Sequence, residues 1–124
     1  MSENELDQWV TLAIHDAETA RLLVVEHGYP EIIIYHMHQA IEKYLKALLV
    51  KAGRSIRRTH HIDVLLSELI ETYPPLKEIQ EPVLFVHTYS PRLRYPTGDT
   101  LQQSDVEILT PRFEQILATI RSIV

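Results

Sequence analysis

The stretch YHMHQAIEKYLKALLVKAG, from Tyr35 to Gly53, decides the fold of this chain. It continues for about five helical turns without a proline. Polar side chains form one narrow stripe on it, at spacings of three and four residues, and apolar side chains cover the remaining surface. The stripe consists of Gln39, Glu42, Lys43 and Lys46, and the apolar set consists of Met37, Ala40, Ile41, Tyr44, Leu45, Ala47, Leu48 and Leu49. We therefore predict a central helix that is covered on several sides, by its own bundle or by a second subunit.

A helix is predicted ahead of the central one, because apolar residues recur at helical spacing from Asn4 to His27. Gly28 is expected to stop this first helix and Pro30 to prevent its continuation. The central helix then runs over residues 31–52 and ends at Gly53. Since the joint between the two helices is short, we expect them to form an antiparallel hairpin.

Two helices are predicted after the basic loop that follows Gly53. Thr59 is the expected N-cap of a short helix over residues 62–72, and the run Tyr73-Pro74-Pro75 breaks it. Residues 76–88 predict a further helix, in which Pro82 implies a kink or a late start.

The last third of the chain predicts a loop and then a long helix. Two prolines and a glycine argue against a helix from Tyr89 to Gln103, and we interpret this segment as a loop. Loops of this length inside compact domains are usually functional or mobile. The pattern Ser104-x-x-Glu107 is a capping box that opens a final helix over residues 104–124. The fold expected for residues 1–124 is thus a single all-α domain, an up-and-down four-helix bundle with one short extra helix.

Composition excludes several classes of function. The formal net charge of −5 argues against a broad nonspecific nucleic-acid surface, so any anion site must be local. The chain has no cysteine, which excludes disulfides and thiol chemistry and suits a reducing compartment. No apolar run approaches the roughly 18 residues that span a bilayer. With only three glycines there is no glycine-rich phosphate loop. We expect a cytoplasmic protein that has no cofactor and does not contact a membrane.

Three motifs resemble the HEPN domain family. Gln39, Ala40, Glu42, Lys43, Leu45, Lys46, Leu48, Leu49 and Gly53 match its QAxEKxLKALL core, Thr59-His60 with Leu65-Leu66 match its tHxLxxLL, and Arg94-Tyr95-Pro96 match its RYP signature. The resemblance spans nearly the whole chain in the right order. It implies the same helical fold, homodimers, and an association with nucleotide or RNA binding. Stand-alone HEPN proteins of this length resemble those encoded beside a small nucleotidyltransferase, as halves of a toxin–antitoxin-like pair.

The first candidate for chemistry is the predicted loop, which carries Tyr89, Arg92, Arg94 and Tyr95 within seven residues. Arginine binds phosphate through a bidentate fork, and tyrosine stacks on a base. This combination suits a nucleotide or an RNA strand. The alternative is structural: Arg94 pairs with a carboxylate while Tyr95-Pro96 closes the end of the bundle. A second candidate is the polar stripe, where Lys43 and Lys46 either offer two ammonium groups to a phosphate or belong to a structural network.

Histidine is abundant, with seven residues, but its spacing does not predict a metal site. His36 and His38 stand on opposite sides of a helix. His60 and His61 are adjacent, have no cysteine partner and belong to no HExxH pattern. We therefore expect no metal, and we expect His60 to make a capping or packing contact.

His87 is the candidate catalytic residue. The run His87-Thr88-Tyr89 resembles the tail of the Arg-x4–6-His motif of catalytic HEPN ribonucleases, in which histidine activates a ribose hydroxyl and arginine stabilises phosphorane charge. The positions where that arginine should stand, 79–82, hold no basic residue. Three functions follow: a nucleotide- or RNA-binding module, a metal-independent endoribonuclease that uses His87 with Arg92 or Arg94, and a non-catalytic dimeric scaffold.

Overall fold

This computed structural model describes residues 3–96 and 98–124, and most of these residues lie in helices. These residues form six α-helices and one 3-10 helix and contain no strand. The elements are α1 (Glu3–Val25), α2 (Pro30–Lys51), α3 (Ile62–Leu69), η1 (Pro74–Ile79), α4 (Gln80–His87), α5 (Ser90–Arg94) and α6 (Gln103–Ile123). The expected all-α bundle is confirmed. Within the described residues, no helix is long and apolar enough to cross a membrane.

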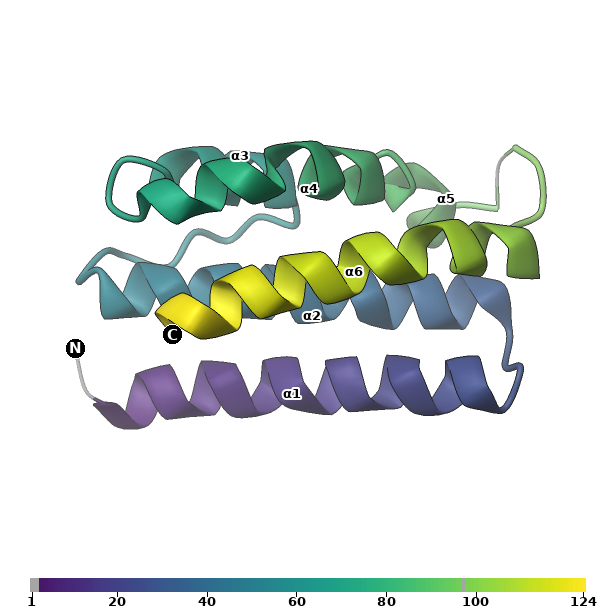
Figure 1. The fold of residues 1–124 in the computed structure, drawn as a ribbon, viewed down its shortest axis with the longest axis horizontal. Coiled ribbons are helices and arrows are strands. Elements are labelled where there is room, and N and C mark those ends of the chain that lie inside the picture. The colour runs from purple at the N-terminus through teal and green to yellow at the C-terminus, as the bar shows by residue number, and fades with distance from the viewer. Residues whose placement is uncertain (1–2, 97) are drawn as a thin grey trace.

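The helix α2 is central, as predicted. It packs against α1 on one side and against α6, α3 and α5 on the others (Figure 1). Leu45 and Leu48 in its middle are 0% exposed within a single subunit. The bundle itself therefore covers the apolar surface of α2, and a second subunit is not needed to explain it.

The hairpin of α1 and α2 is also confirmed, but α1 ends earlier than predicted. It stops at Val25, and His27 rather than Gly28 takes the left-handed backbone conformation, with φ of 54°. Gly28 donates its backbone N–H to the carbonyl of Leu23 at 2.8 Å. A Cβ atom on Gly28 would lie 3.0 Å from the Leu23 side chain, so a larger residue at this position would have to displace Leu23 slightly.

The helix α2 ends where the sequence indicates. Gly53 has φ of 72°, a conformation that glycine adopts without steric cost. The N–H groups of Gly53 and Arg54 donate to the carbonyls of Val50 and Leu49, both at 2.9 Å, which satisfies the last turn of the helix.

Two predicted capping residues are wrong, although α3 starts at the predicted Ile62 and α6 starts only one residue before the predicted Ser104. Thr59 is not the N-cap of α3; His61 holds that position, and Thr59 instead accepts the backbone N–H of His61 on its hydroxyl at 3.1 Å. The last helix begins at Gln103, ahead of the predicted Ser104-x-x-Glu107 box. Asp105 accepts the backbone N–H of Gln102 at 2.8 Å, so a carboxylate two residues earlier than expected closes this end.

The segment around the two prolines differs from the predicted loop. Residues Ser90–Arg94 form the short helix α5, because Pro91 stands in its first turn, where a missing N–H costs nothing. Tyr95 precedes Pro96 and is extended, with φ of −134° and ψ of 142°, which ends α5. Pro82 also stands in the first turn of a helix. The 3-10 helix η1 ends at Ile79, and α4 begins only at Gln80.

Candidate functional site

A pocket of about 520 Å³ opens between the loop that precedes α3 and the end of α4 with α5. Its lining is basic and aromatic, and it contains no carboxylate. The lining residues are Arg58, Thr59, His60, His61, His87, Ser90, Pro91, Arg94 and Tyr95. Residues from two distant parts of the sequence therefore meet at one concave surface.

The loop that precedes α3 has three arginines, and two of them have partners on α3. Arg57 pairs with the carboxylate of Glu68 on α3 at 3.2 Å, and Arg54 donates to the backbone carbonyl of the same residue. Arg58 has no hydrogen-bond or ion-pair partner within residues 3–96 and 98–124. Its guanidinium is thus left for the pocket.

The helix α5 also carries one arginine with a protein partner and one without such a partner among the described residues. Arg92 donates to the backbone carbonyl of Asp99 at 2.9 Å and lies over the ring of Tyr89. Arg94 is exposed at the end of α5 and has no such partner in the described part of the chain. Tyr95 beside it is 64% exposed. The predicted pairing of Arg94 with a carboxylate on a neighbouring helix is therefore wrong.

Three imidazoles form a chain from the core to the surface. Nε2 of the buried His38 lies 3.4 Å from Nδ1 of His87, and Nε2 of His87 lies 3.4 Å from Nδ1 of the exposed His61. Burial lowers the pKa of His38 to about 4 and is also the main reason that the pKa of His87 is lowered. Both rings are therefore neutral at neutral pH, and the positive charge of the pocket comes from its arginines.

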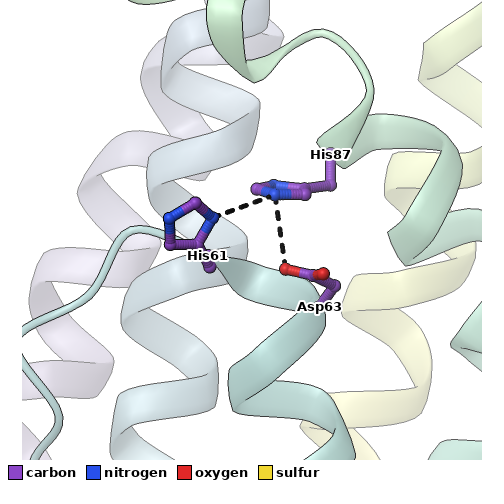
Figure 2. A group of neighbouring side chains, drawn as sticks. All are labelled: His61, Asp63 and His87. Carbon is purple, nitrogen blue, oxygen red and sulfur yellow. Dashed lines mark hydrogen bonds and ion pairs between the residues drawn. The ribbon is translucent and has the colours of Figure 1, made fainter.

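Asp63 on α3 completes this cluster (Figure 2). Its Oδ1 atom lies 3.3 Å from Nε2 of His87, a separation that qualifies as an ion pair only when the imidazole is protonated. Oδ1 is buried and accepts no hydrogen bond from the described residues. Figure 2 shows His61 and Asp63 both directed toward the ring of His87.

The residues of the QAxEKxLK motif have structural partners. Glu42 is 3% exposed and accepts both Nζ of Lys46 at 3.0 Å and Nδ1 of His60 at 3.0 Å. Nζ of Lys46 also lies 5.6 Å from the centre of the Trp9 ring. This buried group joins α1, α2 and the loop that carries Arg58, so the motif holds one wall of the pocket in place.

Four residues predicted to bind a nucleotide or RNA lie outside the pocket. Lys46 is held by Glu42, and Lys43 pairs with Asp16 on α1. Tyr89 is 8% exposed and donates its hydroxyl to Asp105 at 3.1 Å. Arg92 is the fourth and lines a separate recess beside Asp99. Gln39 is half-buried on α2, and Pro96 is exposed after α5.

Sequence reasoning missed Arg58, His61 and Asp63. Arg58 lies in a loop whose sequence indicates only that it is basic, and nothing in the sequence around Asp63 indicates a functional role. The spacing of the histidines along the chain does not reveal that His61 and Asp63 meet His87 across two helices. Only the adjacent pair His60-His61 could have indicated the site from the sequence. Neighbouring side chains at the beginning of a helix face different surroundings, and here His60 contacts Glu42 while His61 contacts His87.

The sequence was compared with family models, curated proteins and solved structures. Residues 6–123 match the model of the HEPN domain. No curated protein matches the sequence significantly. The crystal structure of an archaeal HEPN homologue is similar, with a TM-score of 0.71, 24% sequence identity, and 98% of each chain covered. At this identity the structural likeness concerns the fold alone.

Proposed function

The chain belongs to the HEPN domain family, and on this premise we propose that it binds the phosphate groups of a nucleotide or an RNA strand in the basic pocket. One observation carries the proposal. Arg58 and Arg94, from opposite walls, line a pocket that contains no carboxylate, while their neighbours Arg57 and Arg92 have protein partners. Two unpaired guanidinium groups across one pocket suit a phosphate, which each can bind with two parallel hydrogen bonds.

The rest of the lining fits the same ligand. Tyr95 is largely exposed at the pocket rim, where its ring is free to stack on a base. His60 and His61 offer imidazole nitrogens at the opposite rim. Because the net charge of the chain is −5, attraction of RNA must be local, and we expect a small salt dependence that reflects few phosphate contacts.

A binding measurement with matched arginine variants tests this proposal. Labelled single-stranded RNA and free nucleotides are titrated with the wild-type chain, with Arg58→Ala and Arg94→Ala, and with the control Arg57→Ala. Loss of a charge-assisted contact is worth about 1.5–3 kcal/mol, so each pocket variant should bind at least about tenfold more weakly. Arg57→Ala removes the same charge from the same loop but should bind as the wild type does. Equal losses in all three variants, or no binding by the wild type, would contradict the proposal and favour a non-catalytic scaffold.

The assembly is a further part of the proposal. We place the protein in the cytoplasm as a homodimer that partners a small nucleotidyltransferase in a toxin–antitoxin-like pair. The support is the family resemblance, together with exposed apolar residues such as Leu22 and Val25 on α1. Sedimentation of the isolated chain and copurification with a nucleotidyltransferase encoded beside it test the two statements separately. A monomer at micromolar concentration would contradict the first.

A metal-independent endoribonuclease is the second candidate, and one observation favours it. His87 lies in the same pocket as Arg94, and burial, with a further contribution from the positive charge of Arg94, lowers the pKa of its imidazole. A neutral histidine beside an arginine can accept a proton from a ribose hydroxyl while the arginine stabilises the phosphorane. RNA cleavage that persists in EDTA and is lost in His87→Ala would establish this activity. Binding without cleavage would exclude it for the RNA tested.

A further inference from the structure

We infer that His61, Asp63 and His87 form a binding site for a divalent transition-metal ion of the Zn²⁺ type. One nitrogen or oxygen atom from each residue lies within 4.8 Å of the other two. Two of the three side chains, His61 and His87, also line the basic pocket, but the binding of a metal ion by this cluster does not depend on the proposed binding of RNA or nucleotides.

The separations between the atoms match those around a metal ion. Nε2 of His87 is 3.3 Å from Oδ1 of Asp63 and 3.4 Å from Nδ1 of His61. Two ligand atoms that are each about 2.05 Å from a tetrahedral Zn²⁺ ion lie about 3.3 Å apart. Two of the three separations therefore match tetrahedral ligand spacing, and the third, between His61 and Asp63, is no more than 4.8 Å.

Hydrogen bonding within the protein does not satisfy this cluster. Nε2 of His87 faces both His61 and Asp63 and carries at most one proton, so it can serve only one of them. Oδ1 of Asp63 is buried and has no hydrogen-bond partner among the described residues. A metal ion would accept lone pairs from all three atoms at once, and so would satisfy the buried oxygen.

The surroundings suit a metal ligand in two further respects. Nδ1 of His87 lies 3.4 Å from Nε2 of His38, a contact that orients the His87 ring from behind, as the outer partners of metal-bound histidines do. Two imidazoles and one carboxylate select Zn²⁺, Co²⁺ or Ni²⁺ over Mg²⁺ and Ca²⁺, which prefer oxygen ligands. Three protein ligands leave a fourth position open, and His61 and His87 both line the pocket that this position would face.

Equilibrium dialysis of the untagged full chain, stripped with chelator, against ZnCl₂ tests the site. We expect one Zn²⁺ per subunit, and no binding of Mg²⁺ at the same concentration. His61→Ala and Asp63→Asn should each weaken Zn²⁺ binding by at least about tenfold. The matched control is His15→Ala, which removes an exposed imidazole from α1, a helix that carries none of the three ligands. It should bind Zn²⁺ within about twofold of the wild type.

Visible absorption of the Co²⁺ form provides a second measurement, because a four-coordinate Co²⁺ ion absorbs far more strongly than the hydrated ion. The strong bands should appear with the wild type and be lost in His87→Ala. If His87→Ala does not fold, His61→Ala still decides, since His61 is exposed and the core does not depend on it. Equal Zn²⁺ affinity of His61→Ala and the wild type, or equal losses in His15→Ala and His61→Ala, would overturn the inference.

Discussion

Nδ1 of His60 lies 3.0 Å from Oε1 of Glu42, and this contact fastens the loop that precedes α3 to the middle of α2. Glu42 is buried and at the same time accepts the ammonium group of Lys46. Two motifs far apart in the sequence therefore meet at one carboxylate. The contact also places Arg58, two residues before His60, on the wall of the pocket.

Removal of this carboxylate should destabilise the fold. Glu42→Ala would leave Lys46, whose side chain is 9% exposed, as a buried charge without its carboxylate partner. Breaking a buried pair from one side costs about 3 kcal/mol, so the midpoint of urea unfolding should fall markedly. Glu107→Ala removes an exposed carboxylate from α6 and should change stability by no more than about 0.5 kcal/mol. Equal unfolding midpoints for Glu42→Ala and the wild type would show that the buried network does not stabilise the bundle.

Burial of α2 by its own bundle leads to a second prediction. Leu45 is 0% exposed, and truncation to alanine leaves a cavity, so Leu45→Ala should lower the free energy of unfolding by about 2–5 kcal/mol. Leu84→Ala is the matched control, because the same change on α4 affects a side chain that is 53% exposed. Thermal unfolding at several protein concentrations measures both. If Leu45→Ala unfolded like the wild type, the placement of Leu45 in the core of the subunit would be incorrect.

The variant Tyr89→Phe tests whether Tyr89 has a structural role or binds the ligand. Its hydroxyl donates to Asp105, and burial is the main reason that its pKa is raised, so it remains a donor at neutral pH. Tyr89→Phe removes this hydrogen bond and should cost about 1 kcal/mol of stability. The affinity for RNA should not change, because Tyr89 does not line the basic pocket. A loss of RNA affinity as large as that of Arg94→Ala would instead show that Tyr89 takes part in RNA binding.

Much of the fold follows from the sequence because it depends on periodicity. The apolar pattern around Leu45 and the glycine at position 53 indicate both the central helix and its end. Capping residues are harder to predict, because they depend on local competition between side chains. Gln102 with Asp105, rather than Ser104 with Glu107, forms the capping box of α6, and Pro91 lies in the first turn of a helix within the predicted loop.

The candidate site was only partly predictable, because it depends on contacts between distant residues. Arg94 and Tyr95 could be chosen from their residue types, and His87 from a motif. Nothing in the local sequence distinguishes Arg58 from Arg57, since the difference lies in which of them reaches Glu68 on α3. Asp63 likewise gains a role only when α3 packs against α4 and brings its carboxylate to His87.

An ion pair between the two long outer helices should make stability depend on pH. Arg21 on α1 donates from Nε and a terminal nitrogen to the two carboxylate oxygens of Glu114 on α6, at 2.9 and 2.6 Å. These hydrogen bonds are the main reason that the pKa of Glu114 lies below its usual value of 4.5. The unfolded chain therefore takes up this proton first as pH falls. The stabilisation by Glu114 is complete above pH 4.5 and disappears as pH falls through the lower pKa of the folded state.

The variant Glu114→Gln tests this pH dependence. Both side chains are 40–44% exposed, so the pair contributes no more than about 1 kcal/mol at neutral pH. Glu114→Gln should be less stable than the wild type by that amount at neutral pH, and the difference should shrink steadily below pH 4.5. The measurement is urea unfolding at several pH values, with Glu107→Gln, an exposed carboxylate on the same helix, as the control. A difference that stayed constant with pH would mean that the ionised form of Glu114 is not what Arg21 stabilises.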